Sequence, residues 1–196
     1  MHPILNRNLY LVKEHVGLFK VASNYDVFDP ETGELIIECR EERIGAITKL
    51  MRAVSNYDRF LPFHVDVRTA DGEDILSVQR GISLVRSNVS VLNERDERVG
   101  GFKQPLVSLF AKFAVVGEDG TPLCTLKGKF TGRSFRFERD GVLLATVAQK
   151  FSGIGKELFT SADNYVLKIE ETVPADNPIR TLIFAAVMCI DKVLKE

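Results

Sequence analysis

Short runs in which apolar and polar residues alternate dominate the first three quarters of the chain. Between residues 63 and 68, Phe63, Val65 and Val67 alternate with polar side chains, and residues 134–138 repeat the pattern around Phe135 and Phe137. Successive side chains of a β-strand point to opposite faces, so this period of two predicts strands with one buried and one solvated face.

Turn-forming residues separate these runs. Gly reaches left-handed turn positions without the Cβ penalty, so Asp-Gly and Pro/Gly breaks between β-rich runs indicate hairpins. The pattern predicts about a dozen short strands, a number typical of a sandwich or a closed antiparallel barrel. The turn glycines have no fixed period, which argues against a solenoid or propeller. The four breaks are Asp29–Gly33, Asp71-Gly72, Asp119-Gly120 and Asp140-Gly141.

Two stretches have helical rather than strand periodicity. Apolar residues three to four apart predict a surface amphipathic helix over residues 43–55. A second helix is expected at the C-terminal end, with Asn177 at the N-cap and Pro178 at the first helical position.

The second helix contains nine consecutive apolar residues, from Leu182 to Ile190. A helix without a polar face must be surrounded by protein or by lipid. Because a bilayer span needs about 20 apolar residues, burial inside the protein is favoured over a tail anchor. A closed barrel of this size needs a filled interior, so we expect a mainly β fold (α+β) in which the barrel surrounds this helix.

Composition restricts the class of protein further. The chain has 196 residues, 45% of them hydrophobic, and a formal charge of −1, which predicts one folded domain over residues 1–196 and no nucleic-acid partner. Three widely spaced cysteines predict neither a disulfide framework nor a zinc site. The start of the chain lacks a secretory pattern, so we expect a cytoplasmic protein, with peripheral membrane attachment as the alternative.

No set of residues predicts catalysis, a metal site or a cofactor. The three histidines have no metal-ligand spacing, and no nucleophile motif or phosphate-binding loop is present. Gly153-Ile154-Gly155 lacks the third glycine of a dinucleotide motif and is interpreted as a turn or bulge. Cys189 is interpreted as a small buried hydrophobe, and Asp191 as a structural carboxylate at the end of the helix.

The most informative charged segment is KGKFTGRSFRFERD, residues 127–140. Lys127 and Lys129 share one strand face, and Arg136 is expected close to them on a paired strand across a turn at Thr131-Gly132. With Arg133, these residues are candidate ligands for anionic phospholipid headgroups. The alternative is an ordinary solvated outer face.

The C-terminal quarter resembles the phospholipid scramblase family. The matching elements include Phe151-Ser152-Gly153-Ile154, Phe159-Thr160, Ala162-Asp163-Asn164-Tyr165 and Ile190-Asp191. The upstream strings FDPETGELI and PFHVDVRTADGEDILSVQRG agree more loosely, and are similar also to the plant LURP-one-related proteins. Both families have the tubby C-terminal-like fold, so the resemblance implies a twelve-stranded β-barrel wrapped around a hydrophobic C-terminal helix.

Several features of the animal scramblases have no counterpart here. The chain has neither their palmitoylated cysteine cluster nor a basic import segment at Ala148–Phe151. The proposed calcium segment corresponds to Ser161–Thr172 and keeps only Asp163 of its acidic positions, so calcium binding is not expected there. The resemblance implies a non-enzymatic barrel that associates with membrane phospholipids. The alternative is a soluble regulatory or ligand-binding barrel without lipid-translocating activity, and the sequence identifies no protein partner for either.

Overall fold

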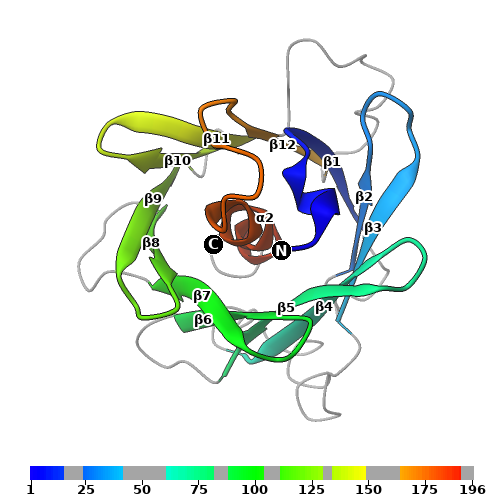
Figure 1. Cartoon of the computed structure of the whole chain (residues 1–196), viewed down its shortest axis with the longest axis horizontal. Helices are drawn as coiled ribbons and strands as arrows, with labels where there is room; N and C mark the ends of the chain where they lie inside the picture. Colours follow the sequence, from blue (N-terminus) through cyan, green and yellow to red (C-terminus); the bar gives the residue numbers. More distant parts are fainter. Residues whose placement is uncertain are drawn as a thin grey trace.

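Twelve antiparallel strands form a closed barrel in the part of the chain that the computed structural model describes, residues 1–15, 24–41, 61–81, 88–103, 111–129, 134–148 and 164–190. Each strand pairs with its neighbours in sequence, and β1 pairs with β12 to close the ring (Figure 1). The predicted strand number and barrel are therefore confirmed. The strands are β1 (Leu9–Glu14), β2 (Tyr25–Phe28), β3 (Leu35–Arg40), β4 (Phe63–Thr69), β5 (Asp74–Arg80), β6 (Asn88–Asn93), β7 (Arg98–Lys103), β8 (Ala111–Gly117), β9 (Pro122–Lys129), β10 (Ser134–Arg139), β11 (Val142–Ala148) and β12 (Asn164–Ile169).

The four predicted hairpin turns join β2–β3, β4–β5, β8–β9 and β10–β11. Their glycines have positive φ, as at Gly72, where φ is 90°. A fifth hairpin, which was not predicted from the sequence, joins β6 to β7 through residues 94–97. There Asp96, with φ of 60°, takes the left-handed position that a glycine takes in the other turns.

Each of the five hairpins contains a β-bulge near its turn, because the pairing register shifts by one residue. The extra residue always lies on the second strand and is always apolar, and it belongs to the core or packs against it. A bulge adds twist and lets two successive side chains point inward. One end of the barrel therefore gains a ring of apolar side chains, made of Ile36, Ile75, Val99, Leu123 and Leu144.

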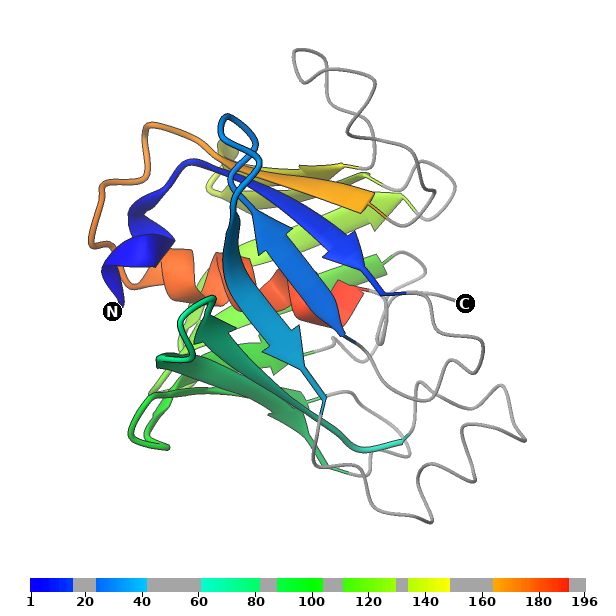
Figure 2. The same cartoon turned by 90° about the vertical axis from the view of Figure 1, so that its right-hand side faces the viewer.

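The apolar C-terminal helix α2 (Ile179–Cys189) runs inside the barrel, as predicted (Figures 1 and 2). Its residues from Leu182 to Cys189 are at most 6% exposed, and the Phe184 ring meets the ring of Tyr10 edge-on at 5.3 Å between centroids. The helix begins one residue later than predicted, with Pro178 rather than Asn177 at the N-cap. Asn177, which precedes the cap, still accepts the Ile179 N–H through its Oδ1 at 3.1 Å. The helix thus replaces the solvent that a barrel of this width would otherwise enclose.

A short 3₁₀ helix, η1 (Pro3–Asn6), closes the barrel end at which α2 begins (Figure 2). The β1–β12 pair has no hairpin and therefore adds no bulge residue to the apolar ring. Leu5, which is 1% exposed, and Ile4, which packs against the core, fill this place in the ring. This helix was not predicted from the sequence, because four residues show no periodicity.

The buried guanidinium of Arg180 joins three segments at this end. It donates to Val173 O at 2.6 Å and Pro174 O at 2.8 Å in the β12–α2 connection, and to the carbonyl oxygen of Asn6, the last residue of η1, at 3.2 Å. Five hydrogen bonds to neutral oxygens offset the cost of burying this charge. The first turn of α2 is thereby fixed to the N-terminal segment.

The predicted amphipathic helix over residues 43–55 lies outside the described residues. Within the described segments, no helix combines the length and the apolar character needed to cross a bilayer.

Candidate functional site

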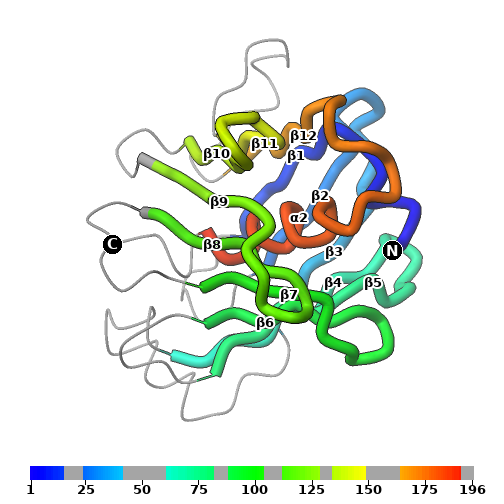
Figure 3. Tube along the Cα trace, turned by 60° about the vertical axis from the view of Figure 1, so that its left-hand side comes forward, coloured from blue at the N-terminus to red at the C-terminus, as the bar shows by residue number. Residues whose placement is uncertain are grey.

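Three basic residues lie in one row on the outer face of β8, β9 and β10, which are adjacent strands in Figure 3. The pairing places Lys112 opposite Lys127, and Lys127 opposite Arg136. Paired residues on neighbouring strands lie about 5 Å apart, so the three side chains form one continuous cationic strip. We call Lys112, Lys127 and Arg136 the basic row.

The alternation of the strands dictates that these residues face outward. Phe113, Leu126 and Phe135, their chain neighbours, are at most 4% exposed and belong to the core. Lys112, Lys127 and Arg136 are exposed. The apolar residues hold the strands against α2, and the period of two then directs the charges to solvent.

Within the described strands, Glu138 is the acidic residue that pairs with the basic row. Glu138 Oε2 accepts a hydrogen bond from Lys127 Nζ at 2.6 Å, and the two side chains are 24% and 53% exposed. Exposed ion pairs contribute about 0–1 kcal/mol, so an incoming phosphate could displace the carboxylate at little cost. Among the described residues, Lys112 and Arg136 form no ion pair.

The same line of paired residues continues to Thr146 on β11 and Lys168 on β12. Lys168 Nζ bonds Glu170 at 2.9 Å, and three strand positions separate it from β9 in a closed ring of twelve. That separation is about a quarter of the circumference, so a flat surface touching Lys127 would not reach Lys168. The basic row therefore ends at Arg136.

The predicted strand pairing is confirmed where the structure describes it, while headgroup binding by these residues stays a prediction. Arg136 lies opposite Lys127, and the backbone of Lys129 lies opposite Ser134. Arg133 and the Thr131-Gly132 turn lie outside the described residues, as does the side chain of Lys129. Lys112 was missed because its segment, AKFAVV, contains a single charge and no basic cluster.

The three histidines each pair with a different carboxylate rather than with one another. The contacts are His2 with Glu73 at 3.3 Å, His15 with Asp26 at 2.7 Å, and His64 with Asp66 at 2.9 Å. His64 and Asp66 lie on the outer face of one strand, where the His64 ring hydrogen-bonds to the Asp66 carboxylate. Among the described residues, no three metal-ligating side chains cluster.

The cysteines are buried and separate. Burial raises the pKa of Cys124 to about 12, and raises the pKa of Cys39 and Cys189 still more. The Cys189 thiol donates to Ala185 O at 3.5 Å, within its own helix. Because the thiolate is the reactive form, these are packing residues, as predicted for Cys189. Asp191, Asp163 and Gly153–Gly155 lie outside the described residues.

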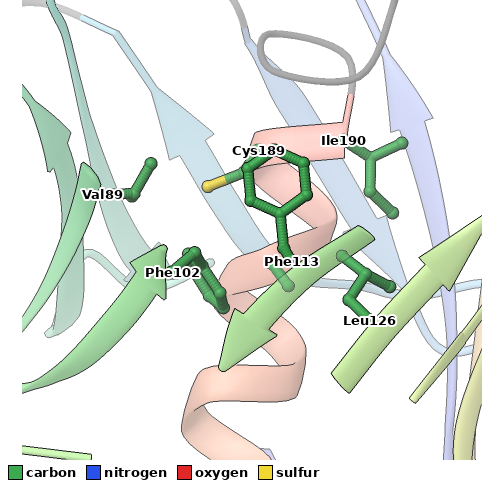
Figure 4. A pocket seen from close by; sticks show the side chains of 7 residues that line it. Val89, Phe102, Phe113, Leu126, Cys189 and Ile190 are labelled. Atoms are coloured by element: carbon green, nitrogen blue, oxygen red, sulfur yellow. The ribbon is translucent and has the colours of Figure 1, made fainter. Parts of the chain in front are cut away.

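A small apolar gap separates the last turn of α2 from the barrel wall (Figure 4). It has a volume of about 10 Å³, the lower limit for one water molecule, and no polar lining, so a water molecule there would have no hydrogen-bond partners. A lipid acyl chain would have to displace side chains to enter. The lining residues are Val89, Phe102, Phe113, Leu126, Ala186, Cys189 and Ile190.

Comparison with solved structures supports the fold. The chain is similar to an Arabidopsis thaliana protein of known X-ray structure, with a TM-score of 0.57 and 14% sequence identity. The match covers 98% of this chain and 96% of the plant protein. At this identity the likeness establishes the barrel architecture. No curated protein matches the chain significantly.

A family comparison reaches almost the whole length of the chain. The model of the Scramblase family matches residues 8–195, which include every strand of the barrel and helix α2. The residues from Phe151 to Ile190-Asp191, which carry the resemblance in the sequence, lie within this match. The chain belongs to the Scramblase family.

Proposed function

We propose that this barrel binds anionic phospholipid headgroups at a membrane surface through the basic row, Lys112, Lys127 and Arg136, together with Lys129 and Arg133. The observation that carries the proposal is the pairing register, which aligns three exposed cations across neighbouring strands. Membership of the Scramblase family suggests a lipid-related function, and this family is in general not enzymatic.

The geometry suits a phosphate-bearing surface. A guanidinium donates two parallel hydrogen bonds to phosphate oxygens, while an ammonium acts as a compact point charge. Three such groups on neighbouring strands span about 10 Å, a width that neighbouring lipid headgroups can match. Each basic side chain near an anionic leaflet contributes about 1 kcal/mol, so the row alone supplies about 3 kcal/mol.

Vesicle flotation tests the proposal. The double reversal K112E/R136E replaces two attractive charges with two repulsive ones, a change of about 4 kcal/mol, or roughly a thousandfold in partitioning. Binding to phosphatidylcholine vesicles that contain phosphatidylserine should be lost, and the wild-type binding should weaken with salt.

The matched control is R95E/R139E, which makes the same change in net charge at two exposed positions outside the row. It should retain vesicle binding, and both double variants should keep the wild-type thermal midpoint. If both double variants lost vesicle binding equally, the loss would be due to the change in net charge and not to the basic row. Absence of wild-type flotation would favour the alternative, a soluble regulatory or ligand-binding barrel.

Lipid translocation is distinct from lipid binding. The apolar residues of α2 pack against the inner face of the barrel, so they would meet lipid only if the barrel opened. We therefore propose surface binding without translocation by the closed barrel. Exchange of fluorescent lipid between leaflets, measured on vesicles with purified protein, should stay at the protein-free rate.

A further inference from the structure

All five hairpins point toward the same end of the barrel. In a barrel whose strands run alternately up and down, every second connection lies at one end, and the N-terminal segment and the β12–α2 connection share that end (Figure 2). We call this end the hairpin rim. It consists of residues 1–8, 29–34, 70–73, 94–97, 118–121, 140–141 and 170–178.

The hairpin rim is strongly acidic. These segments hold 37 of the 196 residues but 14 of the 27 Asp and Glu residues, against 2 of the 26 Lys and Arg residues. Their formal charge is −12, and the rest of the chain therefore carries +11. The acidic residues are Asp29, Glu31, Glu34, Asp71, Glu73, Glu94, Asp96, Glu97, Glu118, Asp119, Asp140, Glu170, Glu171 and Asp176.

Basic residues at the adjoining ends of strands and helix reduce this excess without removing it. Arg68, Arg98, Arg139, Lys168 and Arg180 lie there, together with the carboxylates of Asp74 and Glu138. When all seven are included, the rim still has a formal charge of −9. The near-zero charge of the whole chain thus hides a molecule with one acidic end.

The basic row lies away from that end. Lys112 precedes Gly117, the last residue of β8 at the rim, by five positions, and Arg136 precedes the rim residue Asp140 by four, which correspond to about 16 Å and about 13 Å along the strands. Both distances exceed the Debye length of about 8 Å at physiological ionic strength. The row and the rim can therefore experience different electrostatic environments if the barrel is inclined to a charged surface.

We propose that the barrel docks on anionic membranes in one orientation, with the basic row toward the headgroups and the hairpin rim lifted away from them. This proposal rests on the proposed function. A barrel lying flat on its side would bring rim carboxylates as close to the lipid phosphates as the basic row, and their repulsion would cancel the attraction. Inclination keeps the attraction and moves the rim beyond the screening length.

Site-specific labelling tests the orientation in the full-length protein. The native cysteines are buried and poorly reactive, so an introduced cysteine can be labelled selectively. Ser134→Cys places a fluorophore two residues from Arg136, whereas Ala70→Cys and Ala175→Cys place it on the rim, all at exposed uncharged positions. With phosphatidylcholine/phosphatidylserine vesicles carrying headgroup nitroxide lipid, the label at residue 134 should be quenched and the two rim labels should not.

A charge-neutralised rim provides the second measurement. Glu31, Glu118 and Glu171 are exposed, and the triple change to Gln removes three negative charges from the rim. If the rim is lifted, vesicle affinity should change by less than about twofold, because the charges lie beyond the screening length. A strengthening of about tenfold or more would place the rim near the lipid and overturn the inclined orientation.

The possible outcomes separate the two proposals. Binding with quenching only at residue 134 supports both. Binding with quenching at residue 70 or 175 overturns the orientation and leaves headgroup binding intact. Failure of the wild-type protein to float with anionic vesicles overturns headgroup binding, and the orientation with it.

Discussion

Replacing the buried Arg180 should strongly destabilise the whole barrel. The residue is 2% exposed and makes five hydrogen bonds with its guanidinium. It also places a positive charge in the first turn of α2, where the helix dipole is unfavourable to cations. The acceptors are Asn6 O, Arg7 O, Asn8 Oδ1, Val173 O and Pro174 O.

The expected magnitude follows from these contacts. A hydrogen bond to a charged group contributes about 1.5–3 kcal/mol, but the five share one side chain and are not additive. Removing one side of a buried polar network typically costs about 3–5 kcal/mol. For Arg180→Met, which keeps most of the apolar volume, we therefore expect a loss of about 4 kcal/mol, or about 8–16 °C in Tm for a chain of this size.

Urea unfolding followed by circular dichroism would measure this loss. Arg180→Lys is the matched control, because it keeps the charge and a long side chain but replaces five N–H donors with three. It should lie between the wild type and Arg180→Met. A loss below about 1 kcal/mol for Arg180→Met would refute the reasoning, since water at the rim would then replace the guanidinium without cost.

Three further predictions concern packing, pH and thiol reactivity. A Cβ at Gly100 would lie 2.5 Å from Val116 O and 2.8 Å from Leu182 Cδ2, so Gly100→Ala should lower the free energy of unfolding, measured in urea, by several kcal/mol. Gly33 has open space around it, so Gly33→Ala should lower this free energy by only about 1 kcal/mol, because of the positive φ. Hydrogen bonds from backbone N–H groups and from Arg7 hold the pKa of Asp29 below its ordinary value. Its stabilising contribution is therefore complete above about pH 4 and is lost as the pH falls through the folded-state pKa, so Asp29→Asn should flatten the acid side of the stability profile; an unchanged profile would contradict this. The buried thiols of Cys39, Cys124 and Cys189 should react with a polar disulfide reagent at about pH 8 only at the rate of global unfolding. Rapid labelling of the folded protein would contradict their burial.

Local chemistry made much of this fold predictable. Three Asp-Gly pairs and Gly33 of the Asp29–Gly33 break occupy turns with left-handed positions, so four hairpins could be placed from a few residues each. The apolar run of α2 is equally local and is confirmed, whereas the predicted N-cap at Asn177 lies one residue before the observed N-cap, Pro178. The β6–β7 turn escaped prediction because Asp96 replaces the expected glycine. The helix η1 escaped because its role depends on a cavity formed by distant strands.

The alignment of the basic row could not be predicted from local sequence. Extending the β8–β9 pairing from the Gly117–Thr121 turn without a shift would place Lys112 opposite Leu126. The bulge between Val115 and Val116 moves the register by one and brings Lys112 opposite Lys127. A bulge is a compromise between turn geometry, twist and the apolar ring at the rim, and no short segment encodes it alone.

Residues close together in the chain encode the strands, their turns, the buried helix and the motifs of the family, so all of these can be predicted from the amino-acid sequence. Which charged residues lie next to one another is determined only by the folded barrel. Arg180 contacts residues more than 170 positions away, and the acidic rim is assembled from seven separate segments. Both depend on closure of the barrel between β1 and β12, a non-local pairing whose register is set by the whole ring of strands and the helix that they enclose.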